Sequence, residues 1–174
     1  TFRSIALAEV PQGVRIFDHR WVDTESKSRL TVKDLKVFGY DSVEDKNCPT
    51  PSAISNGVFD WYVAKFQYEC KTYDIVAAFP HALESNEHVY MWPPKEWCDK
   101  YGVEVGSIVW HMIRSLYGRG PAAGNFRLLH EAIIVTVPGM GFKMLSSEPC
   151  MYFSSPSKTM VIHHIDDGRV GGPG

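Results

Sequence analysis

Three acidic residues in two distant segments are the strongest chemical signal in the sequence. Asp74 lies in the segment Thr-Tyr-Asp-Ile-Val-Ala-Ala-Phe, and Asp166 and Asp167 end the segment Val-Ile-His-His-Ile-Asp-Asp. Each segment contains a short apolar run typical of a β-strand. Carboxylates at the ends of neighbouring strands can face one cleft, and three of them can hold two divalent cations. Such a pair of cations supports phosphoryl transfer to or from a nucleic acid.

The same residues also have an ordinary structural interpretation. Asp74 alone could serve a cap or a turn, and adjacent Asp166 and Asp167 after an apolar run are typical of a hairpin turn. His163 and His164 precede them in the sequence. We do not predict a transition-metal site there, because adjacent residues on a strand point to opposite faces.

A basic stretch near the N-terminus is the second candidate binding feature. Lys27, Arg29 and Lys33 are separated by even numbers of residues, which places all three on one face of a strand. A basic face of this kind could bind a triphosphate. Because Asp18 and Asp23 lie in the same stretch, a solvated surface is the alternative interpretation.

Composition is typical of an ordinary globular domain. The chain has 174 residues, of which 44% are hydrophobic and 22% charged. A net charge of −2 argues mildly against a dedicated nucleic-acid binder. No apolar run approaches the length of a membrane span, so we expect none. The cysteines form no Cys-x-x-Cys pattern, which favours reduced thiols and an intracellular protein. The chain begins at Thr1, which leaves room for a removed targeting segment of unknown destination.

Periodicity and turn residues predict an α+β protein. We expect an antiparallel sheet with helices packed on one face, and Asp74 on a central strand. Two helices are predicted, at 53–68 with Ile54, Val58, Tyr62 and Phe66 recurring at helical spacing, and at 121–137 with Phe126, Leu129, Ile133 and Val137 on its buried face. A loop is expected at 41–51. The predicted strands are 15–22, 28–32, 71–77, 87–92, 108–113, 150–153 and 159–165.

The order of these motifs resembles the reverse transcriptase domain of copia-type LTR retrotransposons, in its fingers and palm portion. Segment 27–33, Lys-Ser-Arg-Leu-Thr-Val-Lys, resembles the basic fingers strand, and segment 74–79, Asp-Ile-Val-Ala-Ala-Phe, the first catalytic motif. Segment 115–126 resembles the loop and helix that support the template. Segment 164–167, His-Ile-Asp-Asp, resembles the Tyr-x-Asp-Asp box. The resemblance covers nearly the whole chain.

This resemblance implies a polymerase palm fold and RNA-directed DNA polymerase activity by two-metal-ion nucleotidyl transfer. It implies that Asp74 and Asp166 are the main ligands of two Mg²⁺ or Mn²⁺ ions and that Asp167 assists them. The corresponding division of the chain is an N-terminal segment at 1–14, a fingers-like segment with a β-hairpin at 15–52, a palm-like domain at 53–167 and a flexible, glycine-rich tail at 168–174.

The resemblance also implies the nucleotide-binding residues and the partners. Lys27, Arg29 and Lys33 would bind the triphosphate of the incoming dNTP. Phe79 would act as a steric gate that excludes a ribose 2′-hydroxyl, although core packing is the ordinary role of a phenylalanine at such a position. The partners would be an RNA or DNA template-primer and dNTPs.

Several residues depart from the family pattern at functional positions. Gly120 and Pro121 stand where the family has a Lys-Gln pair, and Asp34 stands where it has a glycine near a phosphate path. The dipeptide Gly168-Arg169 interrupts the apolar strand after the paired aspartates. We expect these changes to weaken nucleotide binding and the framework of the site. The family's thumb would lie beyond Gly174, so processive synthesis by this chain alone is not expected.

Whether the protein is an enzyme is therefore left open by the sequence. One hypothesis is an RNA-directed DNA polymerase that is partial or weak as an isolated chain. The alternative is a catalytically inactive, retrotransposon-derived palm domain that serves as a structural or binding subunit for protein partners in a larger assembly. A metal-dependent nuclease using the same carboxylates is a third reading, for which the sequence has no separate motif.

Overall fold

The chain divides into two compact units in the computed structural model, which describes residues 1–34, 48–85 and 88–174. Unit 1 comprises Thr1–Lys46 and Phe79–Phe126, and unit 2 comprises Asn47–Ala78 and Arg127–Gly174. This division differs from the contiguous one expected from the sequence, because strands from 79–126 pair with strands near the N-terminus. Residues 41–47 of the expected loop lie outside the described residues.

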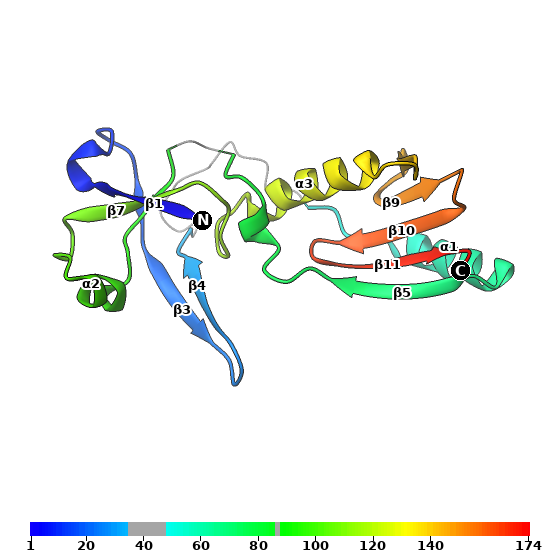
Figure 1. Cartoon of the computed structure of the whole chain (residues 1–174), viewed down its shortest axis with the longest axis horizontal. Helices are drawn as coiled ribbons and strands as arrows, with labels where there is room; N and C mark the ends of the chain where they lie inside the picture. The colour runs from blue at the N-terminus through cyan, green and yellow to red at the C-terminus, as the bar shows by residue number, and fades with distance from the viewer. Residues whose placement is uncertain (35–47, 86–87) are drawn as a thin grey trace. The chain divides into compact units, whose positions relative to one another are not determined.

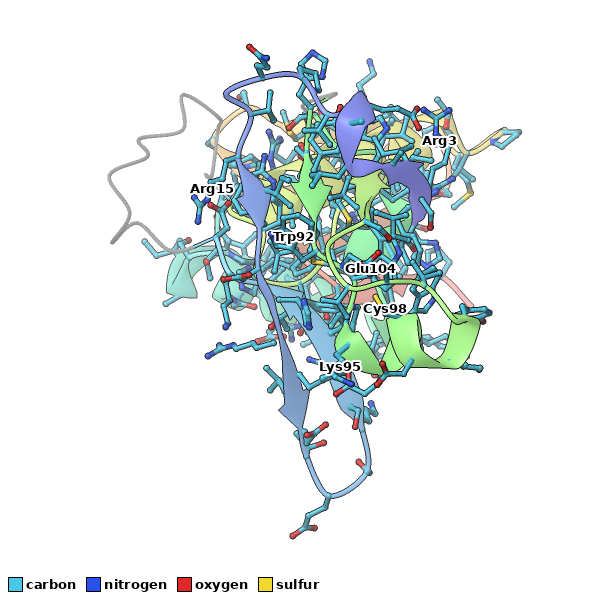
Figure 2. The ribbon with its side chains drawn as sticks, turned by 90° about the vertical axis from the view of Figure 1, so that its left-hand side faces the viewer. Arg3, Arg15, Trp92, Lys95, Cys98 and Glu104 are labelled. Atoms are coloured by element: carbon cyan, nitrogen blue, oxygen red, sulfur yellow. The ribbon has the colours of Figure 1, made fainter. Side chains whose placement is uncertain are left out.

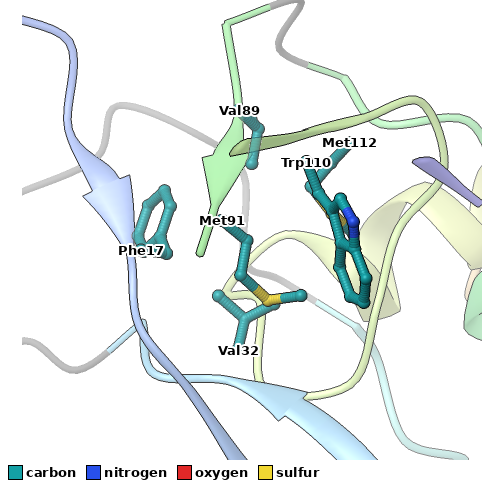
Figure 3. Close-up of a cluster of buried hydrophobic side chains, with 6 residues drawn as sticks. All are labelled: Phe17, Val32, Val89, Met91, Trp110 and Met112. Carbon is teal, nitrogen blue, oxygen red and sulfur yellow. The ribbon is translucent and has the colours of Figure 1, made fainter. Parts of the chain in front are cut away.

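Unit 1 is built on a four-stranded sheet of order β1-β7-β6-β2. Its core contains six buried side chains, Phe17, Val32, Val89, Met91, Trp110 and Met112 (Figure 3). The helix α2 (Lys95–Tyr101) adds Trp97 to this cluster and ends at Gly102 in the left-handed conformation. The strands are β1 (Phe2–Ala6), β2 (Ile16–Phe17), β6 (Tyr90–Met91) and β7 (Ile108–Met112). The strand β1 had no clear sequence signal and is held by its pairing with β7.

The predicted hairpin is confirmed in unit 1. Strands β3 (His19–Asp23) and β4 (Ser28–Val32) pair in antiparallel register and project from the sheet region (Figure 2). The turn is closed by the Thr24 amide, which donates to the Lys27 carbonyl at 2.8 Å. At the base of the hairpin, Gly118 has φ 82° and an added Cβ would lie 2.2 Å from the Val32 carbonyl oxygen. Only glycine fits this close backbone approach.

Unit 2 is built on a five-stranded antiparallel sheet of order β5-β11-β10-β9-β8 (Figure 1). The expected flexible tail at 168–174 is wrong, because most of it forms β11, which lies between β10 and β5. The strand that carries Asp74 is consequently an edge strand and not a central one. The strands are β5 (Glu69–Asp74), β8 (Phe142–Leu145), β9 (Glu148–Ser154), β10 (Thr159–His164) and β11 (Asp167–Gly172).

The glycines of β11 are required by neighbouring side chains that cross the strand. A Cβ at Gly168 would lie 2.4 Å from the Tyr73 hydroxyl oxygen, and one at Gly171 would lie 2.4 Å from a Val63 methyl group. Glycine within a strand commonly marks a close approach of this kind. A glycine-rich segment usually indicates a fraying tail, but here the glycines allow β11 to lie between β5 and β10.

Helices cover both faces of the unit 2 sheet, so the expectation of helices on one face is wrong. From α1 (Ala53–Phe66), Phe59 packs with Ile162 of β10, whereas from α3 (Ala122–Thr136), Ile134 packs with Val161 of the same strand. Ile162 and Val161 are adjacent and therefore point to opposite faces. The β10 sequence is apolar on both faces, as expected for a strand covered on both sides.

The buried faces of the two helices also differ from the predicted ones. In α1, Ile54 is 79% exposed and Phe59 is fully buried. Apolar residues occur on all sides of this helix, so its sequence does not indicate which side is buried. In α3, Phe126 is buried as predicted, but Ile133 is 54% exposed, and the buried face continues through His130 and Ile134. Among the helices of the described residues, none has the length and apolar character needed to cross a membrane.

We predict that Gly171→Ala destabilises unit 2 by about 1–3 kcal/mol, because its methyl group would overpack Val63 and Phe59. The matched control is Gly57→Ala, at a helical position with nothing within 4 Å, where alanine should stabilise by up to about 1 kcal/mol. Urea unfolding of the two variants measures both effects. Equal midpoints for the two variants would contradict the close approach at β11.

Candidate functional site

Backbone pairing brings two of the three candidate carboxylates to opposing positions. Asp74 at the end of β5 is the register partner of Asp167 at the start of β11. Directly opposed residues on antiparallel strands have Cβ atoms about 4.5–5.5 Å apart. The ladder continues beyond this pair, because the Ile75 amide donates to the Asp166 carbonyl at 2.7 Å. All three acidic residues therefore gather at one end of the unit 2 sheet.

Asp166 occupies the two-residue turn between β10 and β11. Asp167, which follows it, is the register partner of His164, and the turn itself consists of Ile165 and Asp166. Ile165 has φ 53°, a left-handed conformation that is unusual for a β-branched residue. Strain of this kind is often found at functional sites. The hairpin-turn interpretation of Asp166 is thus correct for its backbone, and the turn also places it beside the other two carboxylates.

An open cavity of about 560 Å³ lies at this end of the sheet. Thr72 is two residues before Asp74 and therefore shares its face of the sheet. The register partner of Thr72 is Arg169, whose side chain donates a hydrogen bond to Asn56 of α1. Asp74 and its register partner Asp167 therefore lie on the face of the sheet that α1 covers. The cavity has a polar lining that includes Asp74, Asp167, His164, Thr72, Asn56 and Arg169.

Arg169 connects β11 to α1 within this cavity. Its two terminal nitrogens donate to an Asp60 oxygen at 2.6 Å and to an Asn56 oxygen at 2.7 Å. The guanidinium carbon also lies 4.6 Å from the centre of the Phe59 ring, a cation–π distance. Arg169, which interrupts the apolar pattern of the strand, therefore links β11 to α1.

The donor chemistry at this end of the sheet fits a hard divalent cation, because Mg²⁺ and Mn²⁺ prefer carboxylate oxygens. The arrangement is a facing pair, Asp74 and Asp167, beside a third carboxylate in the turn. Within residues 1–34, 48–85 and 88–174, no group of three or more His, Cys, Asp and Glu side chains is close enough to hold a metal ion. A closed three-ligand centre is thus not formed in this structure.

The opposite face of the same strand ends holds a buried polar cluster that sequence reasoning missed. The Tyr73 hydroxyl and His130 Nε2 lie at a hydrogen-bonding distance of 3.3 Å, and the His130 and His163 ring centres are 4.3 Å apart. The Tyr152 and His163 ring centres are 5.5 Å apart. His163 is 3% exposed, and neither ring nitrogen has a hydrogen-bond partner among the described residues. A signal for His130 existed, because it lies four residues from Phe126 and from Ile134 on one helical face.

Burial controls the protonation of this cluster. Burial, with a smaller contribution from His130, lowers the pKa of His163 to about 4. Burial also lowers the pKa of His130. Burial and the Asp167 carboxylate raise the pKa of Tyr73 far above its ordinary value. At neutral pH both imidazoles and the phenol are therefore uncharged, as a cluster without a compensating ion requires.

The nucleotide-binding candidates lie in unit 1. Lys27, Arg29 and Lys33 are all exposed, on or beside β4. The Arg29 guanidinium lies 5.0 Å from the centre of the Tyr117 ring, and the half-buried Phe79 ring lies 4.9 Å from the same ring. The structure thus brings Arg29 and Phe79 together on Tyr117, a residue to which the sequence assigned no role of its own.

Two of the departures from the family pattern meet in unit 1. The Asp34 carboxylate accepts hydrogen bonds from the Gly120 amide at 2.9 Å and from the Arg119 guanidinium at 2.8 Å. The Arg119 side chain is only 4% exposed and also lies 3.5 Å from a Glu84 oxygen. Asp34 is therefore a paired, structural carboxylate and not a bare acid beside a phosphate path.

No protein-family model matches the chain, and a search of curated proteins returns no match either. The resemblance to reverse transcriptases consequently stands on the motifs quoted above, and the roles that it implies stay predictions.

We predict that acidification destabilises unit 2 through His163. The unfolded imidazole has an ordinary pKa of about 6.5, so the unfolded chain binds the extra proton first as the pH falls. Stability should then decrease from pH 6.5 towards pH 4, by up to about 3 kcal/mol in total. Urea unfolding at a series of pH values measures this slope.

The variant His163→Phe should flatten the slope between pH 6.5 and 5, a range above the ordinary carboxyl titration. The control His88→Gln changes a histidine of unit 1, so the slope for unfolding of unit 2 should stay as in the parent. An unchanged slope in His163→Phe would show that another group carries the acid sensitivity.

We predict that Arg119→Met destabilises unit 1 by about 3–5 kcal/mol, because Asp34 and Glu84 would lose a buried partner. The double variant Asp34→Asn with Arg119→Met should recover part of this loss. The control is Lys95→Met in the exposed pair with Asp99, which should cost less than about 1 kcal/mol. Losses of equal size at positions 95 and 119 would refute the structural role of the Asp34 pair.

Proposed function

We propose that the protein is a reverse transcriptase-like domain that catalyses RNA-directed DNA synthesis at the carboxylate end of the unit 2 sheet. The observation that carries this proposal is the direct pairing of Asp74 with Asp167, with Asp166 in the adjoining turn. Two sequence motifs that resemble the catalytic motifs of copia-type polymerases thus come together. Unit 2 would correspond to the palm, and the β3–β4 hairpin to part of the fingers.

In this proposal Asp74, Asp166 and Asp167 hold the catalytic cations. Two Mg²⁺ or Mn²⁺ ions bound there would lower the pKa of the primer 3′-hydroxyl and neutralise charge on the triphosphate. The strained turn at Ile165 and the pairing of β5 with β11 hold the carboxylate-bearing backbone in place before any ion binds. Clustered carboxylates repel one another, which favours occupation by a cation.

Unit 1 would bind the nucleotide. Lys27, Arg29 and Lys33 carry three exposed positive charges that can contact a triphosphate. Phe79 would exclude a ribose 2′-hydroxyl, and its contact with Tyr117 supports this role because a ring packed on one side is held in one orientation. The substrates would be an RNA or DNA template-primer and dNTPs.

A second candidate function is a catalytically inactive palm domain that binds protein partners in a larger assembly. It is favoured by the lack, in the described part of the chain, of three side chains close enough to share a metal ion. In this case Asp74 and Asp166 would have only structural roles, at the end of β5 and in the turn between β10 and β11. The buried ion pair of Asp34 with Arg119 would contribute to the stability of such a binding domain.

Primer extension on an RNA template with Mn²⁺ or Mg²⁺ separates the two functions. If the first holds, Asp166→Asn should lower the extension rate by at least about 100-fold, because the metal site supplies several kcal/mol of transition-state stabilisation. Asp99→Asn, the same change on the surface of α2, should not alter the rate. A folded parent protein that neither extends a primer nor binds Mn²⁺ would exclude the polymerase and leave the second candidate.

A further inference from the structure

The residues that adjoin the two facing carboxylates form a second row across the same three strands. Asp74, Asp167 and His164 are register partners in the first row. One position further from the end of the sheet, Tyr73 pairs with Gly168, and Gly168 pairs with His163. Neighbouring positions on a strand point to opposite faces, so this second row faces α3.

The side chain of Tyr73 lies across β11 in close contact with Gly168. A Cβ at Gly168 would lie 2.4 Å from the Tyr73 hydroxyl oxygen and 2.5 Å from the ring carbon that bears it. The phenol ring therefore lies directly over the backbone of the residue that follows Asp167. Any displacement of this ring would change the contact between β5 and β11 beside the carboxylates.

His130 closes the row from α3. Its Nε2 lies 3.3 Å from the Tyr73 hydroxyl, and its ring packs 4.3 Å from the ring of His163. His130 is 6% exposed and contacts residues of both outer strands of the row, β5 and β10. A single buried imidazole thus connects the helix to strands on either side of β11.

We propose that Tyr73 and His130 are positioning residues, whose hydrogen bond holds β5 against β11 where Asp74 and Asp167 face each other. Their relevance to catalysis rests on the proposed function, whereas their effect on the strand pairing does not. A phenol that only filled space could be replaced by phenylalanine without consequence. The proposal assigns the effect to the hydroxyl group and its imidazole partner.

Amide hydrogen exchange of Ile75 tests this directly, because its N–H bonds to the Asp166 carbonyl at 2.7 Å just beyond the carboxylate pair. In Tyr73→Phe we expect Ile75 to exchange about fivefold faster, the effect of one lost hydrogen bond on local opening. Hydrogen-bonded pairs alternate along antiparallel strands, so the amide of Val161 faces its partner Tyr152 on β9 and should exchange at the parent rate. Unchanged exchange at Ile75, or an equal increase at both amides, would overturn the proposal.

Two further comparisons exclude a general packing effect. His130→Gln keeps a side chain that can bond the Tyr73 hydroxyl and should stay close to the parent, whereas His130→Leu should behave like Tyr73→Phe. The matched control is Tyr62→Phe, which removes a hydroxyl that donates to the Lys158 carbonyl at 2.9 Å in the same unit. It should leave Ile75 unchanged.

Mn²⁺ affinity, measured on the same proteins, separates this inference from the proposed function. If both hold, Tyr73→Phe should bind Mn²⁺ about tenfold more weakly than the parent, the usual size of such indirect effects. A parent that binds no Mn²⁺ would refute the proposed function, and the exchange of Ile75 would still decide the positioning role. If Tyr73→Phe exchanges faster at Ile75 but binds Mn²⁺ as tightly as the parent, the hydrogen bond holds the strands together without positioning the metal ligands, and that part of the proposal is wrong.

Discussion

The insertion of β11 between β5 and β10 is the constraint on which the rest of unit 2 depends. It sets Asp167 opposite Asp74 and places Asp166 in the turn next to them. It also makes β10 an interior strand, whose apolar residues pack with α1 on one face and with α3 on the other. A strand in this position must accept large side chains from β5 and α1, and glycine is the residue that does so.

The departures from the reverse transcriptase pattern have specific partners in the structure. Gly168 receives the ring of Tyr73, Arg169 binds Asp60 and Asn56, and Asp34 binds Arg119 and Gly120. Each of these residues is accommodated by partners within its own unit, Gly168 and Arg169 in unit 2 and Asp34 in unit 1. The packing of each unit is therefore adapted to the residues it carries. This adaptation is compatible with a polymerase and with a domain kept for binding, because a fold does not determine its function.

The two faces of the carboxylate end have opposite electrostatic character. The α1 face carries exposed carboxylates and a guanidinium around an open cavity, where water and ions can compensate charge. The α3 face carries imidazoles and phenols that burial keeps neutral. Burying polar side chains is costly, so a cluster of them directly behind the carboxylates calls for a reason. Fixing the pairing of β5 with β11 is a reason that the contacts of Tyr73 and His130 support.

Local patterns in the sequence were sufficient to predict both long helices to within two residues at each end and the β3–β4 hairpin. They also predicted acidic residues at or next to strand ends, where Asp74, Asp166 and Asp167 lie. They could not identify β11, because its glycines are needed only to make room for the side chains of Tyr73 and Val63, which are distant in the sequence. They also could not show that 79–126 groups with the N-terminal part, which depends on the pairing of β1 with β7. Periodicity records the environment of each element, whereas strand order and close approaches are properties of contacts between elements. Those contacts exist only in the folded chain, and they place Asp74 opposite Asp167.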